Sequence, residues 1–176
     1  MATSRWHLHR ISALDLALCV RCNRASRNTG ARALFRAASR LGDGAFWYAL
    51  IAALPLVYGP QAWPAAVRMA LVGVLGLAVY KWLKARTLRP RPYQVSPDVV
   101  AAAAPLDRFS FPSGHTLHAV SFTTVCCAHH PELAPALVPF AMLVAASRPV
   151  LGLHYPSDVL AGAALGGALA ALVLAL

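Results

Sequence analysis

Three short polar clusters, far apart in the sequence, carry residue types that act on phosphate groups. The first, residues 84–92, reads Lys-Ala-Arg-Thr-Leu-Arg-Pro-Arg-Pro, and the second, residues 111–115, reads Phe-Pro-Ser-Gly-His. The third, residues 147–158, begins with Ser-Arg and contains His154 and Asp158. Arginine offers a planar fork to phosphate oxygens, and a Ser-Gly turn at a helix start presents free N–H groups to an anion. The three clusters together predict a phosphate-binding site.

Two histidines in different surroundings predict two chemical roles. His154 precedes Asp158 by four residues. If Pro156 opens a helix, the Asp158 carboxylate lies in its first turn and accepts a hydrogen bond from one nitrogen of the His154 ring. The other ring nitrogen is then free to act as a nucleophile. His115 follows the Ser-Gly turn, and we expect it to protonate the leaving oxygen as a general acid.

The remaining site residues are expected to bind the phosphate and to stabilise the charge of the transition state. They are Lys84, Arg91, Ser113, Gly114 and Arg148. The acidic residues Asp98, Asp107 and Asp158 are too scattered along the chain to hold Mg²⁺. The sequence therefore predicts phosphoryl transfer through a phosphohistidine, with no metal ion and no cofactor.

Other polar residues have a simpler interpretation. A single cation near a helix end usually anchors the helix among lipid headgroups, which we expect for Lys81, Arg86 and Arg108. Arg89 is open between anchoring and phosphate binding, because Arg89-Pro90 repeats the Arg91-Pro92 pair. Cys19-x-x-Cys22 lacks the further ligands of a zinc site, and its role stays open.

The remaining histidines are mostly interpreted as polar tips near a membrane boundary. We apply this interpretation to His7, His9, His129 and His130. His118 stands three residues after His115 on the same helical face, so it is a further candidate for lining the pocket.

These clusters must be positioned by apolar elements, because 59% of the 176 residues are hydrophobic and only 12% are charged. Such a composition excludes a disordered chain and disfavours an ordinary soluble enzyme. Five apolar segments predict an all-α integral membrane bundle of about five spans. They are residues 45–58, 65–82, 116–128, 133–147 and 159–176. Several are shorter than the roughly 20 residues that cross the hydrocarbon core, and Gly162-x-x-x-Gly166 predicts close helix packing.

The N-terminal region is basic. Eight arginines lie between Arg5 and Arg40, with apolar residues recurring between them. This pattern predicts amphipathic interfacial helices that contact anionic headgroups, with a break at residues 28–30. The chain is thus divided into a basic amphipathic region, 1–44, and a membrane core, 45–176. Nucleic-acid binding by the arginines is the alternative, but the apolar residues among them suit a membrane surface better.

An alternating path of the five segments brings all three clusters to one face of the membrane. All but one of the 16 Lys and Arg residues then lie on that face, the exception being Arg68. The positive-inside rule favours a cytoplasmic position for this face, although cations that bind an anionic substrate confound the count. A cytoplasmic site would suit a substrate made in the inner leaflet, such as phosphatidylglycerophosphate or a polyprenyl-phosphoryl sugar phosphate.

The three clusters resemble the signature of the type 2 phosphatidic acid phosphatase (PAP2) superfamily. The matching motifs are Lys84-x6-Arg91-Pro92, Pro112-Ser113-Gly114-His115 and Ser147-Arg148-x5-His154-x3-Asp158. They occur in the family's order and span nearly half the chain. The resemblance implies a metal-independent helical-bundle enzyme. It implies nucleophilic attack by His154, orientation by Asp158 and proton donation by His115, with phosphate bound by the other five residues.

Within that superfamily, the chain looks like the small bacterial members, including undecaprenyl-diphosphate phosphatases of the inner (cytoplasmic) membrane. Those usually act on its outer face, in contrast to the charge count above. Vanadate-binding haloperoxidases have a similar site but are soluble and much larger. We therefore expect hydrolysis of a lipid phosphate or diphosphate, such as undecaprenyl or another polyprenyl diphosphate, phosphatidate or phosphatidylglycerophosphate. The alternative is a non-catalytic lipid-binding or carrier protein; the sequence carries no signal for an oligomeric state.

Overall fold

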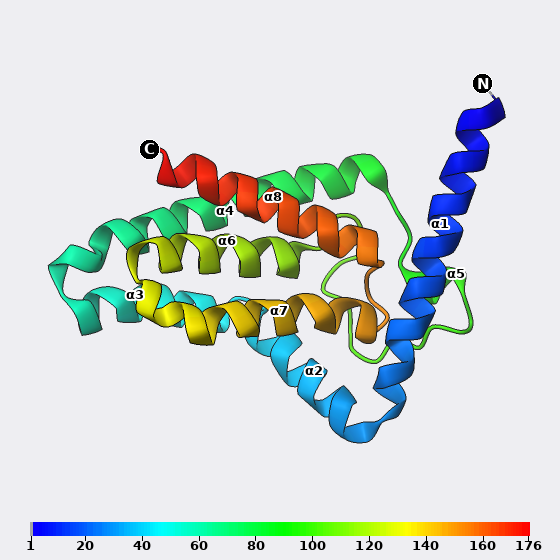
Figure 1. The fold of residues 1–176 in the computed structure, drawn as a ribbon, viewed down its shortest axis with the longest axis horizontal. Helices are drawn as coiled ribbons and strands as arrows, with labels where there is room; N and C mark the ends of the chain where they lie inside the picture. The colour runs from blue at the N-terminus through cyan, green and yellow to red at the C-terminus, as the bar shows by residue number, and fades with distance from the viewer. Residues whose placement is uncertain (1) are drawn as a thin grey trace.

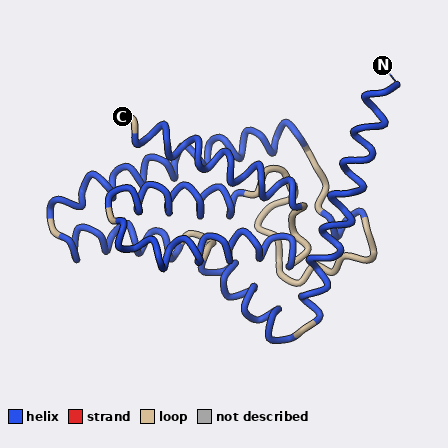
Figure 2. The backbone as a smooth tube through the Cα atoms, in the orientation of Figure 1, coloured by secondary structure: helices blue, strands red, loops and turns tan. Residues whose placement is uncertain are grey.

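The computed structural model describes the backbone of residues 2–176 and the side chains of residues 12–176, all in helices, turns and loops (Figure 2). Five long helices form the bundle. They are α3 (Ala45–Tyr58), α4 (Trp63–Thr87), α6 (Gly114–His129), α7 (Ala134–Val150) and α8 (Pro156–Leu174). Each corresponds to one of the predicted apolar segments, which confirms the all-α fold class. The short helix α5 (Pro92–Val95) and the 3₁₀ turns η2 (Pro60–Ala62) and η3 (Pro131–Leu133) lie in the connections.

The N-terminal region forms α1 (Ala2–Asn23), η1 (Arg24–Arg27) and α2 (Thr29–Leu41). The predicted break is present, because Asn28 has an extended backbone and its side chain accepts a hydrogen bond from Ala31 N as the cap of α2. Both helices pack against α7, and α1 also contacts α8. The predictions for the side chains of Arg5, His7, His9 and Arg10 lie outside the described residues.

Helix α6 lies in the middle of the bundle and packs on α4, α7 and α8 (Figure 1). Its contact with α8 depends on two glycines. A Cβ atom at Gly162 would lie 2.6 Å from the Ser113 carbonyl oxygen, and one at Gly166 would lie 2.4 Å from that of Leu117. These distances are too short for any side chain, so the Gly-x-x-x-Gly face sets how closely the two helices approach, as the sequence predicts.

Fewer than five of the apolar helices are long enough to cross a membrane on their own. Three segments are long and apolar enough to cross a membrane alone: Pro60–Val95, Pro131–Val150 and Pro156–Leu174. A fourth is present if α2 and α3, which bend by 54° at their junction, count as one span. Helix α6 has 16 residues, or about 24 Å, and its burial among other helices removes the need to face lipid along a full span.

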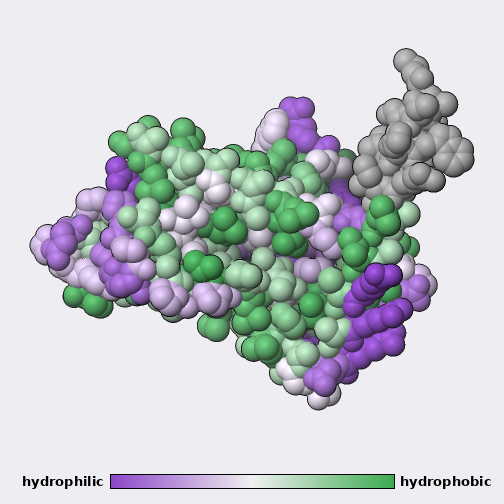
Figure 3. Space-filling model, in the orientation of Figure 1, coloured by the Kyte–Doolittle hydropathy of each residue, from purple (hydrophilic) through white to green (hydrophobic). Residues whose placement is uncertain are grey.

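The hydrophobic core lies among the bundle helices and includes Trp47, Met69, Phe122 and Val144. Apolar residues cover much of the visible flank of the bundle, and hydrophilic ones gather toward its ends (Figure 3). The long loop from α4 to α6 and the turn from α7 to α8 lie at the same end of the bundle (Figure 1). The fold therefore brings the three polar clusters of the sequence to one place.

Candidate active site

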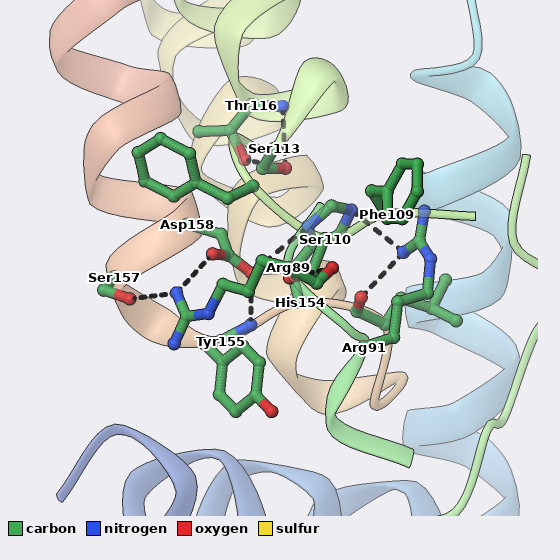
Figure 4. A network of polar contacts seen from close by, with 12 residues as sticks. Arg89, Arg91, Phe109, Ser110, Ser113, Thr116, His154, Tyr155, Ser157 and Asp158 are labelled. Atoms are coloured by element: carbon green, nitrogen blue, oxygen red, sulfur yellow. Dashed lines mark hydrogen bonds and ion pairs between the residues drawn. The ribbon is translucent and has the colours of Figure 1, made fainter. Parts of the chain in front are cut away.

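Five elements deliver the predicted residues to this end of the bundle. Lys84 stands in the last turn of α4, and Arg91 caps α5. The turn before α6 supplies Ser113, Gly114 and His115, the end of α7 supplies Arg148, and the turn into α8 supplies His154 and Asp158. Figure 4 shows the contacts that join the segments around His154. Residues up to 74 positions apart thus form one site.

The turn between α7 and α8 places Arg148 beside His154. The backbone oxygen of Arg148 accepts hydrogen bonds from Leu153 N at 3.1 Å and from His154 N at 3.4 Å. Gly152 makes this tight turn possible, since its φ is +74° and a Cβ there would lie 2.5 Å from the Val100 carbonyl oxygen. These backbone contacts therefore bring Arg148 and His154 close together in the chain's path.

The orientation of His154 is fixed by its neighbours. Its Nε2 lies 3.3 Å from Arg91 Nη1 (Figure 4). A guanidinium can only donate hydrogen bonds, so Nε2 carries the lone pair and the hydrogen is on Nδ1. Burial and the cations of Arg148 and Arg91 hold the pKa of His154 well below its usual value. The ring is therefore neutral at neutral pH, which is the state a nucleophilic imidazole needs.

Asp158 lies beside the other nitrogen of this ring. Its Oδ2 is 3.6 Å from His154 Nδ1, which is longer than a hydrogen bond, and it accepts one from Tyr155 N at 2.9 Å instead. His154 Nδ1 is buried and has no hydrogen-bond partner. Asp158 thus lies on the Nδ1 side of the His154 ring, as predicted. The predicted hydrogen bond between the two side chains is not formed, because the atoms are too far apart.

Asp107, from the loop between α5 and α6, pairs with two of the three cations that were predicted to bind phosphate. Its carboxylate accepts hydrogen bonds from Lys84 Nζ at 2.6 and 2.7 Å and from Arg91 Nη2 at 2.8 Å. Partial burial raises the pKa of Asp107, but the Lys84 and Arg91 cations outweigh it and hold the pKa below its usual value. An internal anion thus sits where an anionic ligand would find its cations.

Arg148 is the third cation of the site and is 2% exposed. Its Nη1 donates to the Ser39 hydroxyl of α2, while its Nε is buried without a partner. A buried donor without an acceptor is costly, and a ligand oxygen would satisfy it. This nitrogen and His154 Nδ1 are two of the four buried side-chain atoms without partners among the described residues.

The turn before α6 divides the predicted roles of its residues. The Ser113 hydroxyl is fully buried and contacts the Thr116 hydroxyl. It also accepts a hydrogen bond from Thr116 N as the N-cap of α6 (Figure 4). Its side chain therefore supports the helix start and does not line the groove described below. His115 does line it, and its Nε2 contacts the carboxylate of Asp43 in the turn between α2 and α3.

A groove of about 1290 Å³ begins at these polar residues and continues between α3 and α4. Near the site it is lined by Lys84, Arg91, Gly114, His115, Arg148 and His154. Farther along it is apolar, with Trp47 and Ile51 from α3 and Val67 and Val74 from α4, and it reaches Pro60 at the opposite turn. The shape is that of a polar head site continued by an apolar channel.

Several residues at the site were not predicted from the sequence. Asp43 comes from the turn between α2 and α3, and Asp107 comes from the loop between α5 and α6. The only sequence signal for Asp43 was its position between Gly42 and Gly44. Arg89, which the sequence left open, turns away from the groove and pairs with Asp158. His118 lines the groove and contacts the Gly73 carbonyl oxygen. Exposed Arg86 lies over the Trp82 ring, at 5.4 Å, as an anchoring cation would.

Two further sequence features are resolved by the packing. All four cysteines are free, and Cys19 is buried with its thiol 3.6 Å from the His154 carbonyl oxygen. Among residues 12–176, no three His, Cys, Asp or Glu side chains gather closely enough to hold a metal ion. The expectation of a metal-free reaction remains a prediction for experiment.

Comparison with known proteins identifies relatives of this fold and site. Residues 61–176 match the sequence profile of the PAP2 superfamily. The decaprenylphosphoryl-5-phosphoribose phosphatase of Mycolicibacterium smegmatis is 38% identical over 139 residues, covering 76% of this chain and 70% of that protein. The lipid A 1-phosphatase of Rhizobium etli is 40% identical over 58 residues, which are 33% of this chain and 25% of that protein.

Two crystal structures share the architecture. A transmembrane PAP2-type phosphatidylglycerolphosphate phosphatase from Bacillus subtilis superposes with a TM-score of 0.79 at 26% identity, covering 94% of this chain and 85% of that one. LpxE from Aquifex aeolicus superposes with a TM-score of 0.75 at 27% identity, covering 93% of this chain and 96% of that one. The similarity extends over almost the whole chain.

Proposed function

The chain belongs to the PAP2 superfamily. From this membership we propose that it removes the terminal phosphate of a lipid-linked phosphate without a metal ion, through a phosphohistidine at His154. The observation that carries the proposal is the convergence of Lys84, Arg91 and Arg148 around a neutral, buried imidazole at the end of an apolar groove. Cations bind the phosphate oxygens, and the imidazole supplies the nucleophile.

The reaction is proposed to run in two steps. In the first, His154 Nε2 attacks phosphorus while Nδ1–H moves into contact with the Asp158 carboxylate. The P–N bond forms, the bond from phosphorus to the lipid oxygen breaks, and His115 gives its proton to that oxygen. In the second, water attacks the phosphohistidine, His115 takes a proton from the water, and the P–N bond breaks to release inorganic phosphate.

The phosphate-binding role assigned to the cations is supported by their present partners. Lys84 and Arg91 already hold a carboxylate, that of Asp107, with the geometry of charge-assisted hydrogen bonds. Arg148 has an unpaired Nε. The N–H groups at the start of α6, where Gly114 lacks a side chain, complete the set of donors. A phosphate would replace Asp107 and give Arg148 its missing acceptor.

The substrate class follows from the groove and from the relatives. An apolar channel that begins at the cations and runs between α3 and α4 suits a long hydrocarbon chain attached to the phosphorylated head. The mycobacterial relative is named for decaprenylphosphoryl-5-phosphoribose. We propose a polyprenyl-phosphoryl sugar phosphate as the substrate to test first, before polyprenyl diphosphate, phosphatidylglycerophosphate and phosphatidate.

Phosphate release from the purified protein in detergent tests this function. We expect release from decaprenylphosphoryl-5-phosphoribose to be unchanged by an excess of a divalent-metal chelator, because the proposed steps use only side chains. The other three lipids, at equal concentration, measure selectivity by kcat/KM. If phosphate is released from none of the four lipids, the proposed enzymatic activity is contradicted and a lipid carrier is favoured. Loss of activity in the chelator would contradict metal independence.

The site is proposed to face the cytoplasm in a bacterial inner membrane. Exposed arginines of η1 and α2 lie at the same end as the site, while Arg68 at the other end pairs with His129. This distribution supports the cytoplasmic face through the positive-inside rule. The arginines of residues 1–44 would then contact anionic headgroups, and the division into this region and the core of residues 45–176 is retained as part of the proposal.

Cysteine labelling tests this orientation. In a background with Cys22→Ser and Cys127→Ser, we expect a cysteine at exposed Ala25 to resist a membrane-impermeant maleimide in intact cells whose outer membrane is permeabilised. A cysteine at Gln61, in the exposed turn at the opposite end, is the matched control and should react. The reverse pattern would place the site on the outer face.

A further inference from the structure

Arg89 lies behind the site, where it joins two acidic residues from different helices. Its Nη1 donates to Asp158 Oδ1 of α8 at 2.6 Å, and its Nη2 donates to Asp15 Oδ2 of α1 at 2.7 Å (Figure 4 shows the first of these contacts). The guanidinium also lies over the Tyr155 ring, with 3.9 Å from Cζ to the ring centroid. One arginine thus connects α1 to the first turn of α8.

Ser157 completes this connection. Its hydroxyl accepts a hydrogen bond from Arg89 Nη1 at 2.8 Å and donates one to Asp15 Oδ2, and its N–H donates to Asp15 Oδ1 at 3.0 Å. Asp15 therefore holds both the N-terminal turn of α8 and the arginine that contacts Asp158. The three residues form a closed ring of hydrogen bonds around the start of α8.

This ring of hydrogen bonds stabilises two buried carboxylates, those of Asp158 and Asp15. The side chain of Asp158 is 0% exposed and that of Asp15 is 7% exposed, so two negative charges lie away from water. Buried charges are tolerated only when paired and fully hydrogen-bonded, and Arg89 supplies the shared counter-ion. With Oδ1 held by Arg89 and Oδ2 held by Tyr155 N, the Asp158 carboxylate cannot rotate away from His154.

We propose that Arg89 and Asp15 are positioning residues for the phosphatase reaction. They hold the Asp158 carboxylate beside His154, and through Asp15 helix α1 contributes to the geometry of the site. The inference rests on the role proposed above for Asp158. Asp15 lies outside residues 61–176, which match the superfamily profile. Neither Arg89 nor Asp15 lines the groove, so both act through Asp158 and not on the phosphate.

Steady-state kinetics of Arg89→Ala, Asp15→Asn and the double variant test this inference with the lipid that the wild type hydrolyses. We expect kcat to fall about 10²-fold in Arg89→Ala, because a small displacement of the group that orients a nucleophile has this effect. KM should stay within about threefold, since the phosphate contacts remain. The double variant should be no slower than Arg89→Ala alone, because both changes break the same connection.

Chemical rescue separates positioning from simple loss of structure. Guanidinium ion, added well below concentrations that unfold proteins, should raise kcat of Arg89→Ala toward that of the wild type and leave Asp15→Asn unchanged. Arg86→Ala, which removes an exposed cation on α4, is the matched control and should keep wild-type kinetics. If Arg89→Ala does not fold, the nearly isosteric Asp15→Asn decides by its kcat.

Failure of this inference can be distinguished from failure of the proposed function. A wild-type protein that releases phosphate while both single variants keep its kcat would overturn this inference alone. So would a loss of kcat that merely follows the fraction of folded protein, or that guanidinium fails to relieve in Arg89→Ala. A wild-type protein that releases phosphate from none of the four lipids would overturn the proposed function, and the inference with it.

Discussion

Replacement of His154 by alanine is expected to lower kcat for lipid dephosphorylation at least about 10⁴-fold, because the variant lacks the atom that forms the covalent intermediate. The ring is 1% exposed and its Nε2 faces Arg91, so no other imidazole can take its place. Phosphate release gives the rate. Rapid quenching with a ³²P-labelled lipid gives the intermediate, which should be stable in alkali, lost in acid and absent from the variant.

The matched control for this change is His129→Ala, at the other end of the bundle beside Arg68. It should keep both kcat and the labelled intermediate. Substantial turnover by the His154 variant would contradict the nucleophile assignment. A labelled intermediate that survives acid would point to an acyl phosphate on a carboxylate instead.

Replacement of His115 by alanine should slow the hydrolysis of alkyl phosphate esters about 10²–10⁴-fold, the range of general acid catalysis. The loss should be much smaller for a matched lipid analogue with a nitrophenyl ester, whose leaving group departs as a stable anion without a proton. His115 lines the groove next to Gly114, and its Nε2 contacts Asp43, a contact that requires a hydrogen on that nitrogen if the carboxylate is ionised.

The comparison of the two esters in wild type and variant measures this role by the ratio of their kcat values. His118→Ala is the control, because His118 lines the same groove one turn further along α6 and contacts the Gly73 carbonyl oxygen. It should slow both esters equally, if at all. An equal loss for both esters in His115→Ala would instead assign His115 to phosphate binding.

The five apolar helices could be predicted because hydrophobic composition and helix-breaking residues are local signals. For example, α3 ends just before Gly59 and Pro60, and α8 begins at Pro156. The packing of α1 and α2 onto α7 could not be predicted in this way. It depends on single polar contacts, such as those of Asn23 with Val100 and Val150, that no periodicity announces.

The site divides along the same line. His154, Asp158, Lys84 and Arg91 could be predicted to lie together because their spacing within each cluster is local, and the structure brings them to one place. Asp107 was considered only as a magnesium ligand, for which the acidic residues are too scattered, yet a loop carries it onto two of the predicted cations. Three residues of the N-terminal region contact site residues or Arg89, namely Asp15, Ser39 and Asp43. They could not be predicted, because they are far from their partners in the sequence.

The predicted phosphate-binding residue Ser113 needs a more specific description. The sequence places it with the phosphate-binding residues, whereas the side chain contacts Thr116 and the backbone N–H of Ser113 donates to the Asp158 carbonyl oxygen at 3.1 Å. Its contribution is to fix the start of α6 against α8. We therefore expect the N–H groups at that helix end, and not the hydroxyl, to contact a bound phosphate.

The pairing of Asp107 with Lys84 and Arg91 has a consequence for inhibition by product. Inorganic phosphate that leaves the site must compete for re-entry with a carboxylate that is tethered to the same chain and therefore present at high effective concentration. The tether weakens the hold on free phosphate and on substrate alike, while the apolar chain of the substrate retains its own affinity for the groove. If these cations bind phosphate as proposed, the apolar chain alone favours lipid over phosphate in solution, and the tether lowers the occupancy of the site at any given concentration of released phosphate.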